Sequence, residues 1–381
     1  MATTRSTNAS GGRGGRRGLR ALALAAGALA TAGVAGFLAC EEVAPFDPAE
    51  LQTFEVQVIE GEVGDAEAPI PYNAQVLEFT LDIRALRNDG EVDTSFTGDV
   101  HLAVGPRGQL AKDQPEWVKL QDGVAEAVTV KIERAHGEVA IWVEDSGDDD
   151  DPGTYATGLT PSIYIGNPTV RQVQETDKYR TSALDGDFVR FNLDGRTAVV
   201  TGVMNDGFYM TDLSEPEGIY NSIFVFTHSR PHGVETGARI VSLAGTAEDF
   251  FGFTEVSFPS WKVDGRTDLP EPIELLPSHL ANNNTMESYE SSLVEVRNVT
   301  VCPMGEGFAT FGQWVVLLDP SGDCGGEATI TVLSTYTVPW FDPPAHVGET
   351  VPVVRGALRY HLSAQPQWIL YPRQEDDIVA P

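Results

Sequence analysis

The sequence predicts an all-β protein, built as a β-sandwich followed by two small tandem barrels. Three observations carry this prediction. Apolar and polar residues alternate along much of the chain, turn signals separate the alternating runs at short intervals, and no window after the N-terminal leader shows the 3.6-residue period of an amphipathic helix. Short strands at this spacing are typical of sandwiches and barrels.

The predicted sandwich covers residues 52–168. The run VLEFTLDI at 76–83 alternates from Leu77 to Ile83, so its apolar residues at 77, 79, 81 and 83 share one face of a strand. The same period returns at 128–132 and at 139–143, and Asn-Asp-Gly at 88–90 marks a turn. These segments predict strands that bury one face each.

An internal repeat predicts the two barrels. The segments 237–245 and 348–356 both read G-x-x-[IV]-x-x-x-x-G, and an aromatic-rich strand follows each of them. Glycines allow the bulges and sharp bends that small closed sheets need. We therefore expect similar barrels at residues 185–270 and 290–381.

The first 39 residues read as an export signal. Five arginines and no acidic residue precede a small, apolar segment at 21–39. The tetrapeptide ending at Cys40, Phe-Leu-Ala-Cys, resembles the lipobox of bacterial lipoproteins, although that pattern has Leu where Phe37 stands and a small residue where Leu38 stands. The resemblance implies cleavage before Cys40, lipidation of its thiol and an acidic tether at 40–51. An ordinary signal peptide or an uncleaved anchor is the alternative.

The predicted location is the cell envelope. Glu41, directly after the cysteine, resembles the arrangement that is sent on to the outer membrane in many Gram-negative bacteria. The side of that membrane, periplasmic or surface-exposed, stays open. Either compartment lies outside the cytoplasm.

Charge limits the partners. The chain carries −31, and without the leader 20 basic residues stand against 56 acidic ones, a balance of −36. A surface this acidic repels phosphate backbones and anionic lipid headgroups. Membrane attachment must then come from the lipid, and we expect a protein or glycan ligand and no direct binding of nucleic acid.

Two cysteines remain after Cys40. An even remainder in an oxidising compartment predicts a disulfide between Cys302 and Cys324. Closing a loop of this size stabilises a fold by about 3 kcal/mol. A pair of buried free thiols is the alternative.

An acidic run is the candidate metal site. Clustered carboxylates beside glycines suit a hard cation such as calcium, and no other cofactor is expected. A solvated turn between two strands is the alternative. The candidate ligands are Asp145, Asp148, Asp149, Asp150 and Asp151.

Aromatic residues of the first barrel form the candidate ligand face. They lie at strand and loop positions where stacking platforms for bases or sugars occur. Core packing is the alternative for any one of them, and alternation predicts that Phe224 and Phe226 point inward. The candidate face consists of Phe208, Tyr209, Phe251 and Phe253.

Two family resemblances follow from longer segments. The runs RNDGEVDTSFTGDVHLAV (87–104) and VTVKIERAHGEVAIWVED (128–145) resemble bacterial immunoglobulin-like domains. The runs AVVTGVMNDGFYMTDL (198–213) and VETGARIVSLAGTAEDFFGFTEVSF (234–258) resemble the OB-like domain of secreted bacterial nucleases, which implies five-stranded, partly open barrels. In those nucleases a catalytic domain follows. This sequence ends at Pro381 without one, so their activity is not carried over.

The sequence contains no G-x-S-x-G, H-E-x-x-H or phosphate-binding glycine motif. The leading hypothesis is therefore a non-catalytic, lipid-anchored display protein. An accessory subunit of extracellular nucleic-acid processing, with its catalytic domain on another chain, is the runner-up. An enzyme of unrecognised type, with a site assembled from distant loops, is the third hypothesis.

Overall fold

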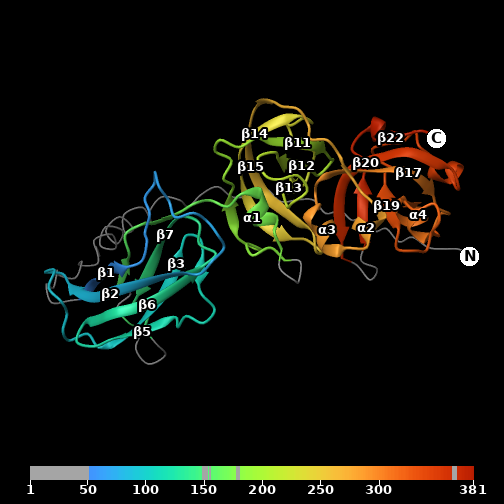
Figure 1. The fold of residues 1–381 in the computed structure, drawn as a ribbon. Coiled ribbons are helices and arrows are strands. Elements are labelled where there is room, and N and C mark those ends of the chain that lie inside the picture. Colours follow the sequence, from blue (N-terminus) through green and yellow to red (C-terminus); the bar gives the residue numbers. More distant parts are fainter. Residues whose placement is uncertain (1–50, 148–152, 154–155, 177–180, 363–366) are drawn as a thin grey trace, which may run out of the picture. The chain divides into compact units, whose positions relative to one another are not determined.

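The computed structural model describes residues 51–147, 153, 156–176, 181–362 and 367–381. These residues form mostly strands, arranged in three sheets with short helices between them (Figure 1). Cys40 and the four aspartates at 148–151 lie outside the described residues, so their predicted roles stay predictions. Within the described residues, no helix has the length and apolarity needed to cross a membrane.

The N-terminal sheet has nine strands and curls on itself. Its hydrogen-bonded path runs β4-β6-β2-β1-β8-β7-β3-β5, and β9 pairs with β7. The apolar residues of the predicted alternation, such as Leu81 and Ile141, are fully buried on its inner face. The strands are β1 (Leu51–Glu60), β2 (Leu77–Arg87), β3 (Gly98–Gly105), β4 (Gln109–Leu110), β5 (Trp117–Leu120), β6 (Val124–Glu133), β7 (Gly137–Glu144), β8 (Thr157–Leu159) and β9 (Ile163–Ile165).

The second sheet closes into a barrel of five strands. The path β11-β12-β13-β15-β14 returns to β11, β13 and β15 run parallel, and β10 adds to β14 outside the ring. The strands are β10 (Phe188–Arg190), β11 (Ala198–Val203), β12 (Gly207–Asp212), β13 (Ser222–Phe226), β14 (Ala238–Asp249) and β15 (Thr254–Arg266).

The third sheet closes by the same scheme. Its ring is β17-β18-β19-β21-β20 and back to β17, with β19 and β21 parallel. The short strands β16 and β22 lie outside the ring, where β16 pairs with β17 and β22 pairs with β20. The strands are β16 (Ile273–Glu274), β17 (Leu293–Val301), β18 (Gln313–Leu317), β19 (Thr329–Leu333), β20 (Thr350–His361), β21 (Gln367–Tyr371) and β22 (Ile378–Val379).

The sequence repeat marks equivalent places in the two barrels. Gly237 and Gly348 both have positive φ, 86° and 84°, within two residues of the start of the fourth strand of their ring. Each amide donates to the first strand of its ring, Gly237 to Val200 O within β11 and Gly348 to Val301 O at the end of β17, both at 2.8 Å. A side chain would strain this turn, because only glycine adopts such a φ freely. The sequence repeat therefore marks the same turn in both barrels.

One predicted orientation is wrong. Alternation placed Phe224 and Phe226 inside the first barrel, but Ile223 and Val225 belong to its hydrophobic core instead. Phe224 lies on the outer face and is nevertheless buried, at 1% exposure. A period of two assigns residues to two faces without telling which face is the barrel interior.

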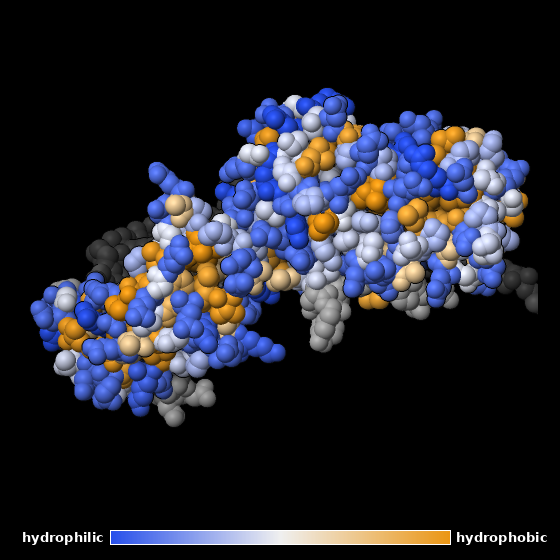
Figure 2. Space-filling view, viewed as in Figure 1, coloured by the Kyte–Doolittle hydropathy of each residue, from blue (hydrophilic) through white to orange (hydrophobic). Residues whose placement is uncertain are grey.

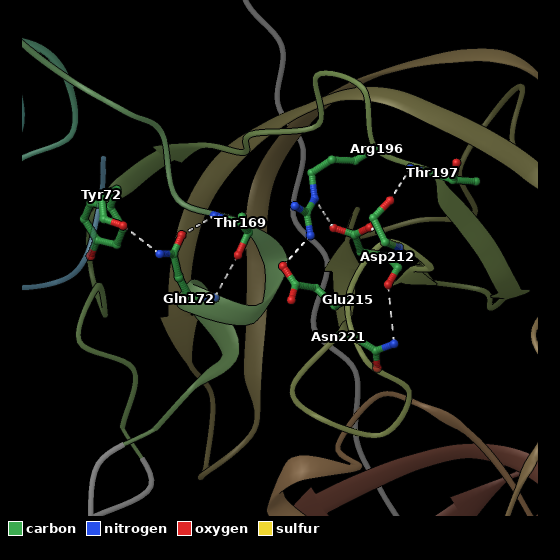
Figure 3. A network of polar contacts seen from close by, with 9 residues as sticks. Tyr72, Thr169, Gln172, Arg196, Thr197, Asp212, Glu215 and Asn221 are labelled. Carbon is green, nitrogen blue, oxygen red and sulfur yellow. Dashed lines mark hydrogen bonds and ion pairs between the residues drawn. The ribbon is translucent and has the colours of Figure 1, made fainter. Parts of the chain in front are cut away.

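Short helices connect the sheets. They are α1 (Val170–Gln174), α2 (Pro277–Leu280), α3 (Asn283–Ser288), α4 (Glu306–Phe311), η1 (Pro343–His346) and η2 (Glu375–Asp377). Helix α1 starts at Thr169 with a capping box, and Gln172 donates to Tyr72 O at 2.7 Å, which links it to the first sheet (Figure 3).

A second polar network fixes the β12–β13 hairpin. Arg196 donates to the buried carboxylate of Asp212 at 2.6 Å and also pairs with Glu215 (Figure 3). Asn221 donates to Asp212 O at 3.4 Å. The arginine satisfies a fully buried carboxylate, which would otherwise carry a large desolvation cost, and Asn221 bonds to the main chain of the same residue.

The predicted disulfide is confirmed. Cys302 and Cys324 are joined, with their Cα atoms 5.6 Å apart. Cys302 directly follows β17, and its amide donates to Val315 O at 2.9 Å. Cys324 lies in the loop between β18 and β19. The bridge therefore ties the end of the first strand to the hairpin loop of the second barrel.

Candidate functional site

The outer face of the first barrel is covered by the second barrel. Tyr209, Phe224 and Glu255 form a row across β12, β13 and β15. Their exposures are 1%, 1% and 3%. Tyr209 and Phe224 pack with ring centroids 4.7 Å apart, and Ala357 of β20 joins the same hydrophobic cluster. An aromatic surface that is usable by a ligand in an isolated barrel is here an internal interface.

A cation from the second barrel lies over this aromatic surface. The guanidinium carbon of Arg359 is 4.4 Å from the ring centroid of Phe253 and 5.7 Å from that of Phe224. Both distances lie within the range of cation–π attraction. Strand β20 therefore holds the interface through an aliphatic contact at Ala357 and a charge at Arg359.

The candidate ligand face divides accordingly. Phe208 belongs to the core of the first barrel, where its ring meets Trp261 edge-on at 5.5 Å. Tyr209 and Phe253 are buried at the interface between the barrels. Only Phe251 is exposed, at 56%, on the loop between β14 and β15, where its carbonyl accepts a hydrogen bond from Leu362 N at 2.8 Å.

Burial at the interface changes the ionisation of Glu255. Burial raises the pKa of its carboxyl from 4.5 to about 7; the Arg359 charge opposes this shift, and the negative charges of Glu248 and Asp206 add to it. Near neutral pH, Glu255 is therefore close to half protonated. The interface contains a group that titrates in the physiological range.

A second carboxyl anchors the segment that joins the barrels. Glu290 is fully buried and accepts hydrogen bonds from Gln174 at 2.8 Å and from the Thr254 amide at 3.1 Å. Its pKa is raised well above 4.5 by burial and by the neighbouring charge of Glu287. Burial therefore favours the neutral form of Glu290, which links α1, β15 and the chain after α3.

The two barrels leave an open cleft beside their interface. It has a volume of about 420 Å³. The first barrel contributes Arg230 and the loop between β11 and β12, which carries Asn205 and Asp206. The second barrel contributes Tyr336, whose side chain is 81% exposed, and Tyr371. Burial raises the pKa of Tyr371 above 10, so its hydroxyl remains a neutral hydrogen-bond donor.

One wall of the cleft is held rigidly. Arg373 donates from Nε and Nη2 to the buried carboxylate of Asp377, at 2.9 and 2.7 Å, and from Nη1 to Thr201 O in the first barrel. A Cβ at Gly202 would lie 2.7 Å from the Arg373 side chain. Glycine at this position is therefore what lets the arginine cross between the barrels.

Of the five candidate metal ligands, the structure describes one. Asp145 is buried at 6% exposure, and the other four candidate ligands lie outside the described residues. Elsewhere in the described part of the chain, no group of three or more His, Cys, Asp or Glu side chains is placed to hold a metal ion. Calcium binding by the acidic run stays a prediction.

Comparison with known proteins adds little. No family model matches the chain, and no curated protein matches it. Among solved structures, it is similar to dimeric latent PorU from Porphyromonas gingivalis, at 10% identity and a TM-score of 0.20. That match covers 85% of this chain and 34% of the other, so the chain spans about a third of that protein's length. Neither the fold nor the function of this chain rests on the similarity.

The sequence missed the cleft because its residues come from separate segments. Tyr336 follows β19, whereas Asp206 and Arg230 belong to loops of the other barrel. A usable signal was Pro339 in the segment STYTVPW, because proline is disfavoured inside a sheet and indicates that Tyr336 lies near a strand end or in a loop. No sequence pattern connects that loop with residues a hundred positions earlier.

Proposed function

We propose that this chain is a non-catalytic, lipid-anchored binding protein of the cell envelope, which presents two OB-like barrels to a protein or glycan ligand. The cleft between the barrels is the observation that carries the proposal. Its volume of about 420 Å³ falls among those of ligand sites, about 300–1,000 Å³. Tyr336 and Tyr371 suit either class of ligand, because each combines an apolar ring with a polar hydroxyl.

The pairing order supports the OB-like assignment. Both rings connect their strands in the order first, second, third, fifth, fourth, with the third and fifth strands parallel. Five-stranded barrels of OB type bind ligands on the face of strands two and three and on adjoining loops. In the first barrel that face is covered. The cleft lies beside it and includes Asn205 and Asp206, from the loop between strands one and two.

The immunoglobulin-like assignment of the N-terminal domain is supported by its inward alternation. The inner face is apolar on both halves of the curled sheet, with Phe79 and Leu81 on β2 and Ile141 and Val143 on β7 all buried. The domain differs from a sandwich of two separate sheets in one respect. Strand β1 pairs with β2 and also with β8, and so joins the two halves into one sheet. In this proposal the domain is a spacer between the tether and the barrels.

The anchor is tested by changing Cys40 to Ala. The unmodified protein should partition into detergent, because acyl chains together suffice for stable membrane attachment. The variant should be soluble or unprocessed. Membrane association of the variant that survives an alkaline wash would rule out a lipid on Cys40.

The cleft is tested by photo-crosslinking in intact cells. A photoreactive phenylalanine analogue replaces Tyr336 in one strain and Phe258 in another. Phe258 is 71% exposed and does not line the cleft, so it is the matched control. We expect a specific adduct with a protein or glycan from position 336, reduced by Arg230→Ala, and none from position 258. Equal labelling from both positions would contradict the proposal.

The same experiment separates the alternative function. An accessory subunit of nucleic-acid processing should give adducts with DNA, and only when calcium or magnesium bridges the acidic surface to phosphate. If position 336 gives DNA adducts that disappear when a chelator is added, the ligand is nucleic acid and the proposal of a protein or glycan ligand is wrong.

A further inference from the structure

A groove on the N-terminal sheet lies outside every site described above. It has a volume of about 530 Å³ and opens on the outer face of β3 and β7. Small residues, Gly105 and Ala140, occupy neighbouring positions at its base. Trp142 and Leu159 stand beside them, paired across β7 and β8, with 37% and 51% of their surfaces exposed. Small residues next to a large indole make a trough with one flat aromatic side.

Trp142 is oriented without being buried. Its Nε1 donates to Glu144 Oε2, two residues along the same strand, at 3.0 Å. Residues two apart on a strand share a face, so this bond fixes the ring above the sheet. A ring that is already oriented loses little conformational entropy when a ligand packs on it. The rest of the visible surface is mostly hydrophilic, with apolar patches on this sheet and on both barrels (Figure 2).

The other end of the groove is polar and electrically balanced. Arg107 donates to His136 O at 2.9 Å and to Glu138 O at 3.4 Å, which holds the guanidinium in place. The Ser162 hydroxyl donates to Glu138 Oε1 at 2.7 Å. One cation and one carboxylate give this end of the groove no net charge. Together they accept and donate hydrogen bonds to hydroxyl groups.

The strand pairing excludes one type of occupant. Strand β7 is hydrogen-bonded to β3 on one side and to β8 and β9 on the other. Strand β7, which forms the base of the groove, therefore has no free edge, so an extended peptide cannot add to this strand by backbone hydrogen bonds. A ligand must bring its own hydrogen-bonding groups and a flat apolar face.

We propose that this groove binds a neutral oligosaccharide. The C–H face of a pyranose ring packs on Trp142, and its hydroxyls bond to Glu138, Ser162 and Arg107. The carboxylates of Glu138 and Glu144 beside the groove and the −31 of the whole chain disfavour anionic sugars. This inference does not depend on the cleft between the barrels, since no residue is shared.

A second tryptophan extends the platform. Trp117 on β5 pairs with His101, which pairs with Glu144, so all three lie on the same outer face as Trp142. Trp117 is 47% exposed, and its ring lies 5.0 Å from that of His101. Two strand spacings and two residues separate the tryptophans, about 10 Å across the strands and about 7 Å along them. A chain of several sugars is needed to touch both rings.

The test measures binding of three neutral hexasaccharides, cellohexaose, hexa-N-acetylchitohexaose and mannohexaose, to the mature chain by calorimetry. Oligogalacturonate is the anionic comparison. At least one neutral probe should bind with a Kd below about 1 mM. Trp142→Ala removes the aromatic platform, and Ala140→Leu fills the base of the groove. Each variant should weaken binding of that probe about tenfold. Trp117→Ala should weaken hexasaccharides and leave disaccharides unchanged.

Two controls make the outcome decisive. Trp340→Ala removes another exposed tryptophan, 46% exposed and in the second barrel, and should bind as the unmodified chain does. Tyr336→Ala should also bind normally, so failure of the cleft proposal is distinguishable from failure of this one. Circular dichroism checks that each variant folds. No binding of any neutral probe, equal binding by Trp142→Ala, or tighter binding of oligogalacturonate would each overturn the proposal.

Discussion

The two barrels share one pairing scheme and differ in what covers the same face. In the first barrel the row across strands two, three and five is Tyr209, Phe224 and Glu255, all buried beneath the second barrel. In the second barrel the corresponding strands carry the row Val315, Thr331 and Ile369. Val315 and Thr331 are only partly buried, and Thr331 donates to Gln367 at 2.9 Å.

This difference shows that topology does not decide the role of a face. Two large aromatic side chains on an outer strand face need cover, because their exposure would leave a sizeable apolar patch in water. At the equivalent places of the second barrel, Val315 and Thr331 are smaller and partly exposed, and only Ile369 is buried, at 2% exposure. The first barrel therefore uses the whole row as an internal interface, whereas the second leaves two of its three residues partly exposed, next to the cleft that Leu333 and Tyr371 help to line.

The largest expected effect comes from truncating the covered row. Phe224→Ala should destabilise the protein by about 3–5 kcal/mol, because it leaves a cavity between the barrels. Thr331→Ala, at the equivalent place in the second barrel, should cost about 1 kcal/mol through one lost hydrogen bond. Denaturant titration followed by tryptophan fluorescence measures both. Equal losses would mean that the two faces are equally covered.

The next largest effect is expected from removing the disulfide, which should destabilise the second barrel and not the first. Replacing Cys302 and Cys324 by serine should lower the stability of the second barrel by about 3 kcal/mol. Hydrogen exchange should show lost protection at amides around Trp314 and little change around Met210 in the first barrel. Alkylation of both thiols without prior reduction would show instead that the bridge does not form in the mature protein.

The interface between the barrels should make stability depend on pH. The folded-state pKa of Glu255 is raised from 4.5 to about 7, so between these values the folded chain holds a proton that the unfolded chain has released. The contribution of Glu255 to stability should therefore be largest below about pH 4.5 and fall as pH rises toward 7. Glu290 acts in the same direction.

Melting temperatures across pH 4.5 to 7 measure this effect. Glu255→Gln keeps a neutral side chain at every pH and should flatten the decline. Glu126→Gln removes an exposed carboxylate of the first sheet and controls for net charge. Parallel curves for the unmodified chain and Glu255→Gln would assign the pH dependence to other groups.

The smallest effect is expected at the exposed member of the candidate ligand face. Phe251→Ser should change stability by less than about 1 kcal/mol, because this side chain is 56% exposed on a loop. Phe253→Ala, two residues along and fully buried, should cost several times more. Similar values for the pair would indicate that Phe251 also packs into the interface in solution.

Local patterns determined much of the architecture. Alternation located the buried residues of β2 and β7, and the glycine repeat located equivalent corners at Gly237 and Gly348. The cysteine pair at 302 and 324 was sufficient to predict the bridge. These signals succeed because strand period and glycine conformation act within a few residues, and because two cysteines remain once Cys40 is set aside.

Only the tertiary structure decided which faces are inside and where a ligand can bind. The period of two could not tell whether Ile223 or Phe224 points into the barrel, and the outer aromatics became an interface only because Ala357 and Arg359 of a distant strand meet them. The cleft and the Trp142 groove likewise join residues from separate strands and loops. Burial depends on what lies opposite a residue in space, and no local pattern in the sequence records that neighbour.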